Sequence, residues 1–274
     1  MYEPVVKWSG SKRSQAATII SKFPTEIETY YEPFCGGASV LRRLLSSDIK
    51  VKNYVCSDIN KGLIDLYEVI KKQPTIVSSY YKDLWTAFNK DNDMERKKAY
   101  FNEVRTRYNK TQDPLDFMFI MRTTTNGMPR YNKNGEFNNS LHITRNGIEP
   151  QRLDKIIKEW SEILNKKQVE FKCCSYTEIH AKKQDVMYLD PPYANTKGMY
   201  YGTIDYAALW EYLRTQECRY YLSFDGISGV QNNVQVIPKD IYTEHVLICS
   251  GNSSFKRTIG KDTAAIVYES LYVK

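Results

Sequence analysis

The sequence predicts an α/β protein, a mainly parallel sheet of about seven strands interrupted by one mainly helical insert. Short apolar runs alternate with helical spacing in the first third of the chain, which indicates parallel strands. Residues 75–124 show helical spacing without a strand signal, and strand-like runs resume from residue 168. With 274 residues, 42% of them hydrophobic, the chain can bury a large core.

The first third of the chain predicts a β-α-β unit. We expect a strand at 29–33, a glycine turn at 34–37, a helix at 38–46 and a second strand at 51–57. Residues 61–72 then return to helical spacing. A crossover of this kind joins parallel strands and is right-handed.

The middle of the chain differs in composition from both ends. Residues 75–124 are rich in Lys, Asn, Asp and Tyr, and residues 126–147 are polar and rich in turn formers. The run Asn-Lys-Asn-Gly at 132–135 is typical of a hairpin turn. Pro150 opens an amphipathic helix that extends to about Lys166.

The remaining strands follow this segment, and the last two are expected to form an antiparallel hairpin. Residues 1–60 and 150–274 are therefore assigned to one α/β domain, and residues 61–149 to a domain inserted into it. The later strands are expected at 168–172, 185–190, 219–224, 243–249 and 264–273, with a helix near 205–216.

Composition excludes some classes of protein. No apolar run approaches the roughly 20 residues that cross a bilayer, and residues 1–12 lack the apolar core of a secretory signal. We therefore expect a cytoplasmic protein that does not bind a membrane. The net charge of +7 permits a polyanionic partner, and the 22 Tyr suit either base stacking or ordinary packing.

Cysteine and histidine give no sign of a metal site. The six Cys form no Cys-x-x-Cys pair, and the three His do not cluster with them. Most Cys lie in or beside apolar, strand-like runs, which favours buried free thiols. They are Cys35, Cys56, Cys173, Cys174, Cys218 and Cys249.

The strongest chemical signal is Asp-Pro-Pro-Tyr at 190–193, directly after an apolar strand. Two prolines stop the strand, because neither can donate to a strand ladder. The carboxyl edge of an open α/β sheet is where ligands bind. This turn thus holds together the Asp190 carboxylate, a backbone carbonyl and the ring of Tyr193. Together they could bind an aromatic amine, because the carboxylate and the carbonyl can accept its N–H groups and the ring can stack on it. A plain strand terminus followed by a turn is the alternative.

Three weaker signals lie nearer the amino terminus. Glu-Pro-Phe-Cys-Gly-Gly at 32–37 places glycines after the first strand, where backbone can approach a ligand, although the spacing does not suit a pyrophosphate. Asp58 ends the second strand, where an acid can reach a ribose diol or cap a helix. Lys-Trp-Ser-Gly-Ser-Lys at 7–12 is a loop of small residues between basic ones.

In their order along the chain, these motifs resemble the Dam-type DNA adenine methyltransferases of bacteria and phages. The likeness runs through nearly the whole chain and includes Ser-Asp-Ile-Asn at 57–60. Residues 107–114 and 129–138 are similar to phage members. The resemblance implies a Rossmann-like methyltransferase sheet, a mainly helical target-recognition insert, S-adenosylmethionine as cofactor and double-stranded DNA as partner. It implies no obligatory protein partner.

The resemblance also implies site residues. Asp190 would take the target amino group, Tyr193 would stack on the target base, and Asp58 would take the ribose hydroxyls of the cofactor. The catalytic positions are Asp190, Pro191, Pro192 and Tyr193. The cofactor-binding positions are Lys7, Trp8, Gly10, Phe34, Cys35, Gly36, Gly37, Asp58, Ile59, Tyr176 and Asp190. The DNA-binding positions are Lys12, Arg122, Thr125, Asn126, Arg130 and Asn132.

Two departures from the family pattern lie in the insert. Thr125 stands where related enzymes often place an aromatic wedge beside the flipped base. Asn-Asn-Ser-Leu-His at 138–142 replaces the Pro-Phe-Gly run that is usual in readers of GATC. Both departures concern the DNA sequence that is recognised and leave the transfer chemistry unchanged, so the recognition sequence stays open.

Other functions stay open at this point. A methyltransferase of the same class could act on the amino group of cytosine, on RNA or on a protein glutamine, although such cytosine and glutamine enzymes usually have Ser or Asn where Asp190 stands. A DNA-binding protein without activity could retain the fold. The intact Asp-Pro-Pro-Tyr, Gly36-Gly37 and Asp58 argue against that loss of activity.

Overall fold

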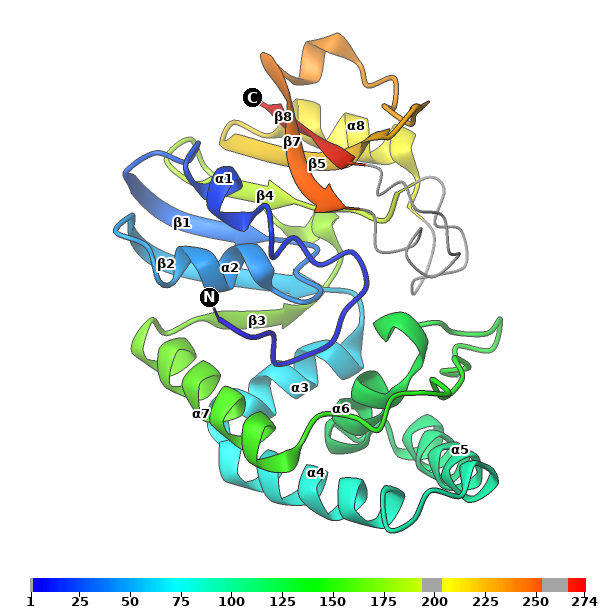
Figure 1. Ribbon diagram of the computed structural model, residues 1–274. Helices are drawn as coiled ribbons and strands as arrows, with labels where there is room; N and C mark the ends of the chain where they lie inside the picture. The colour runs from blue at the N-terminus through cyan, green and yellow to red at the C-terminus, as the bar shows by residue number, and fades with distance from the viewer. Residues whose placement is uncertain (1, 194–203, 253–265) are drawn as a thin grey trace.

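A mixed sheet of eight strands occupies the upper half of the molecule, and helices gather below it (Figure 1). The computed structural model describes residues 2–193, 204–252 and 266–274. The strands follow the order β3-β2-β1-β4-β5-β8-β7, and the short β6 pairs with β5. This is the parallel α/β sheet with a closing hairpin that the sequence predicts.

Five strands pair in parallel from β3 through β2, β1 and β4 to β5. All four residues of β4 are buried, as expected for a central strand that is covered on both faces. The carboxyl ends of β1, β2 and β4 therefore meet at one edge of the sheet, where ligands bind in such folds. The bounds are β1 Glu26–Glu32, β2 Lys50–Asp58, β3 Glu170–Cys173, β4 Val186–Leu189 and β5 Arg219–Ser228.

The carboxyl-terminal strands close the sheet. β8 (Ile266–Val273) runs antiparallel to both β5 and β7 (Glu244–Asn252), which confirms the predicted antiparallel hairpin. Residues 264 and 265 of the predicted last strand lie outside the described residues. The sequence did not predict β6 (Gln231–Asn232), because two exposed polar residues carry no alternation signal.

Helices cover both faces of the sheet. Val186 and Tyr188 of β4 join the apolar cluster that also contains residues of α1 (Ala16–Ile20) and α2 (Ser39–Leu44). The other two residues of β4 join the cluster that contains α8 (Tyr206–Thr215). Successive side chains of a strand point to opposite faces, so β4 connects the two halves of the core. The sequence did not predict the short α1.

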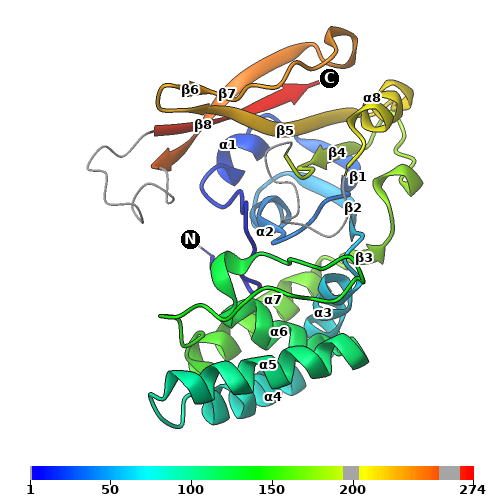
Figure 2. The ribbon, with the colours of Figure 1, turned by 90° about the vertical axis from the view of Figure 1, so that its right-hand side faces the viewer.

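Five helices form the lower half of the molecule (Figure 2). Asn60, Asp93 and Asp113 cap three of them with side-chain oxygens, and prolines open three. α3 packs against β2 and β3 as well as against α6 and α7, so it connects the sheet to the other helices. The bounds are α3 Lys61–Lys72, α4 Pro74–Phe88, α5 Met94–Thr111, α6 Pro114–Thr123 and α7 Pro150–Lys166.

A polar hairpin, residues 124–141, follows α6 and is called the insert hairpin here. Isolated bridges pair Thr124 with Leu141 and Tyr131 with Phe137. The Asn132 side chain accepts the amide N–H groups of Asn134 and Glu136, and Gly135 has a φ of 77°. The predicted turn at 132–135 is therefore confirmed. Short 3₁₀ turns lie at Thr125–Gly127, Tyr176–Glu178 and Lys239–Ile241.

All six cysteines are free thiols, but only three are buried as expected. Cys35, Cys56 and Cys218 lie in the core. Cys173 and Cys249 are exposed because they belong to β3 and β7, the two edge strands of the sheet. Within the described residues, no helix is long and apolar enough to span a membrane.

Candidate active site

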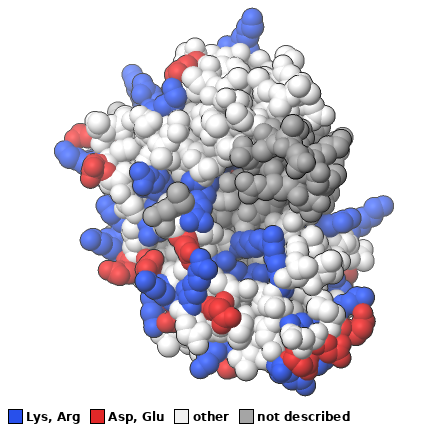
Figure 3. Space-filling view, viewed as in Figure 1, with Lys and Arg blue, Asp and Glu red and all other residues white. Residues whose placement is uncertain are grey.

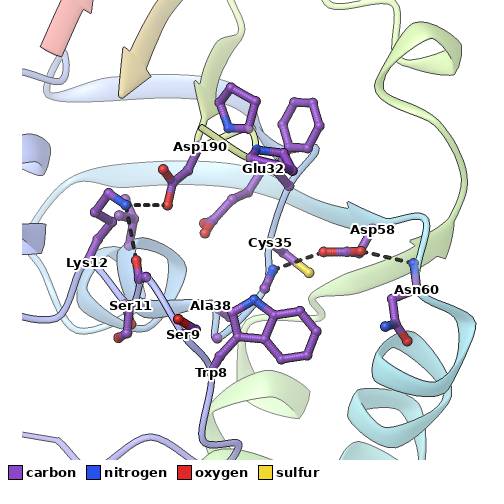
Figure 4. Close-up of a pocket in the computed structure, with 18 of the residues that line it drawn as sticks. Trp8, Ser9, Ser11, Lys12, Glu32, Cys35, Ala38, Asp58, Asn60 and Asp190 are labelled. Atoms are coloured by element: carbon purple, nitrogen blue, oxygen red, sulfur yellow. Dashed lines mark hydrogen bonds and ion pairs between the residues drawn. The ribbon is translucent and has the colours of Figure 1, made fainter. Parts of the chain in front are cut away.

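A cavity of about 370 Å³ lies at the carboxyl ends of β1, β2 and β4 (Figure 4). Four segments that are far apart in the sequence meet in it: the amino-terminal loop, the glycine turn after β1, the end of β2 and the Asp-Pro-Pro-Tyr run after β4. Most of the predicted site residues line it. They are Trp8, Gly10, Lys12, Phe34, Cys35, Gly36, Gly37, Asp58, Ile59, Tyr176, Asp190, Pro191, Pro192 and Tyr193.

The glycine turn forms one wall, and Trp8 lies against it. Gly36 has a φ of +44°, a conformation that favours glycine. A Cβ at Gly36 would lie 2.7 Å from the Trp8 Nε1, and one at Gly37 would lie 3.1 Å from the Trp8 Cβ. Gly36 must therefore stay without a side chain for the indole to cover the turn, and a side chain at Gly37 would crowd Trp8. Phe34 and Tyr176 extend this aromatic lining, with ring centroids 5.3 Å apart.

Asp58 is held by backbone amides at the end of β2. Its Oδ1 accepts the Asn60 N–H at 2.9 Å, and its Oδ2 accepts the Gly36 N–H at 3.2 Å. Burial raises the pKa of Asp58 to about 6, against the opposing effect of these hydrogen bonds. Each oxygen keeps a second lone pair that can accept a ligand hydroxyl. The helix-cap alternative does not apply to the start of α3, because Asn60 is its N-cap.

Asp190 is held by side chains at the end of β4. Lys12 Nζ lies 2.7 Å from its Oδ2, and the Tyr193 hydroxyl donates to its Oδ1 at 3.1 Å. Burial raises the pKa of Asp190, and the charge of Lys12 opposes that effect. The Asp190 side chain is still 19% exposed, so a ligand in the cavity can reach it.

Tyr193 is fixed on both sides. Its ring stacks on Phe224 with centroids 5.7 Å apart, and its hydroxyl donates to Glu269 Oε2 at 3.0 Å. Tyr206 donates to the Pro192 carbonyl at 2.7 Å and so supports the same loop. Glu269 also lines the cavity, although no sequence pattern assigned it to the site.

Two buried groups on β1 and its turn also line the cavity. Glu32 accepts the Tyr30 hydroxyl at 2.7 Å and the Leu41 N–H at 2.9 Å, and burial raises the pKa of Glu32 to about 8. Burial also raises the pKa of the Cys35 thiol well above its ordinary value. A thiol in this state is a poor nucleophile.

The structure places Lys7 away from the residues that line the cavity. Lys7 lies against the insert hairpin, since a Cβ at Gly127 would lie 2.8 Å from the Lys7 carbonyl oxygen. Two residues further on, the Ser9 N–H donates to the Gly127 carbonyl at 2.9 Å. Lys12, expected to contact DNA, instead lies beside Asp190. The sequence order did not reveal that this loop packs against the insert.

The positions expected to contact DNA differ in what they present. Arg122 turns inward, and its Nη2 donates to the carbonyls of Pro4 and Val5 at 2.6 Å each. Burial lowers the pKa of Arg122 to about 10. Its contacts hold the amino-terminal segment, which is a structural role. By contrast, Asn126 and Arg130 are exposed on the insert hairpin.

Thr125 and Asn132 use their side chains within the insert hairpin. Thr125 Oγ1 donates to the Ser140 carbonyl at 3.2 Å, and Asn132 Nδ2 donates to Glu136 Oε2 at 2.8 Å. Asn139 donates to the carbonyls of Thr125 and Met128, both at 3.0 Å. The two departures from the family pattern are therefore in contact with each other.

The cavity suits S-adenosylmethionine. Gly36 and Gly37 leave room that a side chain would fill, Trp8, Phe34 and Tyr176 supply aromatic walls, and Asp58 offers lone pairs. No pyrophosphate-binding lysine accompanies the glycine turn. A doubly covered parallel sheet with an antiparallel last hairpin and such a cavity at its carboxyl edge defines an S-adenosylmethionine-dependent methyltransferase.

Comparison with known proteins identifies the family. Residues 8–247 match the profile of the D12 class N6 adenine-specific DNA methyltransferases, and the chain belongs to this family. It is 31% identical over 206 residues to the Type II methyltransferase M.MjaIII of Methanocaldococcus jannaschii, covering 70% of this chain and 69% of that one. It is 32% identical to the DNA adenine methylase of Vibrio cholerae and 31% identical to that of Escherichia coli K12. Each of these two matches covers 69% of this chain and 64% of the relative.

Proposed function

We propose that this enzyme transfers a methyl group from S-adenosylmethionine to the N6 amino group of an adenine that is flipped out of double-stranded DNA. The observation that carries the proposal is the position of Asp190. Its carboxylate stands at the end of β4, lines the cavity that suits the cofactor, and is partly exposed. An adenine inside a duplex cannot reach this cavity, so it must leave the stack at a cost of roughly a few kcal/mol.

The residues of the cavity would hold the cofactor at several points. Asp58 accepts the ribose hydroxyls, and Trp8 covers the turn of Gly36 and Gly37 beneath the amino-acid end. Ile59, which is 45% exposed, and Tyr176 would flank the adenine ring of the cofactor. When bound, S-adenosylmethionine supplies a methyl group activated by its sulfonium. Direct displacement of such a group needs alignment above all.

Asp190 and its neighbours would act on the target base. The exocyclic nitrogen of adenine is a poor nucleophile, because its lone pair is delocalised into the ring. Asp190 accepts one N–H and the Pro191 carbonyl accepts the other, which localises the lone pair as the nitrogen becomes tetrahedral. Tyr193 stacks on the base, and Pro192 fixes the loop between them. No covalent bond between enzyme and base is required.

Residues 61–149 would form the target-recognition domain, and residues 1–60 and 150–274 the catalytic domain. The insert hairpin supports this division because it offers Asn126 and Arg130 on its surface. On the face in Figure 3, Lys and Arg side chains lie near the middle of the molecule with Asp and Glu side chains among them. Lys and Arg can contact phosphates, which positions a duplex without reading it.

Analysis of the modified base tests the proposed reaction. Unmethylated plasmid DNA is incubated with the enzyme and the cofactor, digested and analysed by mass spectrometry. We expect N6-methyladenine alone. Methylated cytosine, or transfer only to RNA or to protein, would contradict the proposal. Expression in a methylation-deficient bacterium, followed by methylation-sensitive sequencing, then gives the recognition sequence and tests whether the enzyme acts in the cytoplasm of a bacterial or phage-infected cell.

Arg130 tests where the DNA sequence is read. Its guanidinium suits the bidentate contact to guanine, so Arg130→Ala should cost about 1–3 kcal/mol on the cognate site and relax preference at one base pair. Lys133→Ala, an exposed change in the same hairpin, is the matched control. The measurement is methylation of a panel of single-substitution duplexes. Equal losses across the panel would show that Arg130 contacts only the backbone.

A further inference from the structure

We infer that Glu269 is a positioning residue for methyl transfer: it holds Lys12 and Tyr193 around Asp190 and takes over Lys12 when the target amine arrives. The inference rests on the proposed function. Glu269 lies in β8 and lines the cavity beside Lys12 of the amino-terminal loop. Neither its place in the sequence nor its strand suggests a role in the site.

The contacts of Glu269 join the two partners of Asp190. Its Oε2 accepts the Tyr193 hydroxyl at 3.0 Å and lies 3.3 Å from Lys12 Nζ. The same Lys12 and Tyr193 contact the two oxygens of Asp190 at 2.7 and 3.1 Å. Four side chains from three segments thus lie together, with the one hydroxyl proton of Tyr193 and the ammonium of Lys12 shared between the two carboxylates.

The target amine has to approach Asp190 while Lys12 and Tyr193 hold it. Each oxygen of Asp190 keeps a second lone pair that can accept an amine N–H, but the ammonium of Lys12, 2.7 Å from Oδ2, weakens the carboxylate as an acceptor and repels the positive charge that the amine gains. The Lys12 side chain is only 5% exposed and donates to the Gly10 carbonyl at 3.0 Å, so an ammonium that left Asp190 without another anion would lose its nearest counter-charge while buried. Glu269 is that other anion. Lys12 can therefore shift from Asp190 toward Glu269 without crossing solvent.

The backbone around Glu269 supports a role in the site. β5 and β8 change register between Phe224 and Ile227, so that Asp225 and Gly226 bulge opposite Glu269. A Cβ at Gly226 would lie 2.2 Å from the Tyr268 carbonyl oxygen, so glycine is required there. A β-bulge re-aims a side chain and is common beside active sites. The bulge lies in β5 and interrupts the regular ladder directly opposite Glu269, where that side chain lines the cavity.

The inference predicts a shift in the pH dependence of the reaction. Asp190 is faced by Lys12 from the amino-terminal loop, by Glu269 from β8, by Tyr193 from its own loop and by the buried Tyr188 and Glu32 of β4 and β1. Asp225 of β5 faces Glu269 and Lys12 in turn. The charge of Glu269 is one cause that raises the pKa of Asp190. Since transfer needs ionised Asp190, removing that charge moves the acidic limb of kcat to lower pH.

Glu269→Gln tests the inference, because it keeps an acceptor for Tyr193 and removes the anion for Lys12. We expect kcat to fall at least tenfold, with KM for DNA and Kd for S-adenosylmethionine within threefold of wild type, and the acidic limb to move down. Glu244→Gln is the matched control. Glu244 lies in the neighbouring β7, pairs with Lys22 at 2.9 Å and is half exposed, so this change should leave kcat and the limb unaltered.

Several outcomes would overturn the inference. The first is a kcat of Glu269→Gln within twofold of wild type. The second is an acidic limb of the kcat–pH profile that does not move in this variant, and the third is an equal loss of kcat in Glu269→Gln and Glu244→Gln. If thermal melting shows that Glu269→Gln does not fold, Glu269→Asp replaces it. That change keeps the charge but shortens its reach, so kcat should fall while the limb stays. A wild-type enzyme that transfers no methyl group to DNA would refute the proposed function instead, which keeps the two failures distinct.

Discussion

Two carboxylates stand in the same cavity and are held in opposite ways. Asp58 accepts two backbone N–H groups, those of Gly36 and Asn60. Asp190 is held by two long side chains, those of Lys12 and Tyr193. Burial is the largest cause that raises the pKa of both carboxyls. The difference therefore lies in the partners and not in the degree of desolvation.

This difference matches the ligands that we propose for them. Backbone amides cannot turn away, so Asp58 keeps one orientation and suits a ligand that binds in one fixed pose, such as a ribose. Side chains can exchange partners, so Asp190 suits a group that arrives, reacts and leaves. The comparison predicts that changes at Asp190 affect turnover, whereas changes at Asp58 affect cofactor binding.

The largest effect is expected at Asp190. Asp190→Ala should lower methyl transfer at least 100-fold, because the target amine loses its charged acceptor. Binding of S-adenosylmethionine, measured by calorimetry, should stay within a few-fold. Asp185→Asn is the control: it changes a carboxylate just before the other end of β4, which accepts the Thr29 N–H at 3.0 Å. That variant should lose stability and keep its turnover. Tritiated-methyl incorporation within tenfold of wild type in Asp190→Ala would refute the assignment.

The next effect concerns Asp58. Asp58→Ala should weaken S-adenosylmethionine binding by about 1–3 kcal/mol, the usual worth of hydrogen bonds to a charged group. Asp58→Asn should lose less, since one oxygen can still accept the Gly36 N–H. Asp65→Ala removes a nearby carboxylate that pairs with Lys61 outside the cavity, and it should bind the cofactor normally. If Asp58→Ala binds S-adenosylmethionine as tightly as wild type, Asp58 serves only to stabilise the glycine turn.

A smaller effect is expected from pH. The pKa of Asp58 lies at about 6 in the folded protein, so the carboxyl is ionised at pH 7 and becomes protonated as the pH falls through 6. A neutral carboxyl accepts ribose hydroxyls less well, and S-adenosylmethionine should bind several-fold more weakly at pH 5 than at pH 7. Calorimetry at both values measures this. The pH dependence should flatten in Asp58→Asn, and an equal slope in that variant would contradict the assignment.

The smallest effect concerns Glu32, a buried acid that accepts hydrogen bonds from the Tyr30 hydroxyl and the Leu41 N–H. Burial raises its pKa from 4.5 to about 8, so the folded state binds an extra proton between these values and stability falls as the pH rises through them. Glu32→Gln removes this loss. Its melting temperature should equal that of wild type near pH 5 and exceed it by a few degrees at pH 9. A lower melting temperature at pH 9 would show that the ionised form is stabilised.

Much of the fold could be predicted from local patterns. Apolar runs located the strands, helical spacing located the helices, and Pro150 located the start of one of them. The predicted bounds differ from the observed ones where charged residues interrupt an apolar run. β1 begins at Glu26 rather than at residue 29, because the alternation Glu-Ile-Glu places only Ile27 in the core. The motifs at 32–37, 58 and 190–193 could be assigned to one cavity because each follows a strand of the parallel sheet.

The rest depended on contacts between distant segments. Glu269 lies 76 residues from Tyr193, in a strand whose pattern is that of an ordinary hairpin. Arg122 was a candidate for DNA contact, but its side chain reaches carbonyls 117 and 118 residues away. Asn60 donates to the Tyr131 hydroxyl at 3.0 Å, a link between the end of β2 and the insert hairpin that no spacing predicts. Such contacts follow from the packing of the whole chain.

The order of the sheet also governs how the chain can fold during synthesis. β1 pairs with β4, and Thr29 and Asp185 at that seam are 156 residues apart. A ribosome must therefore complete β2, every helix from α3 to α7 and β3 before the middle of the sheet can close. Until then β1 presents an unpaired edge, which invites aggregation. Pairing across such a distance also slows folding, because the loop must close before its contacts form. The helices that are synthesised before β4 can pack against their neighbours in sequence before the middle of the sheet forms.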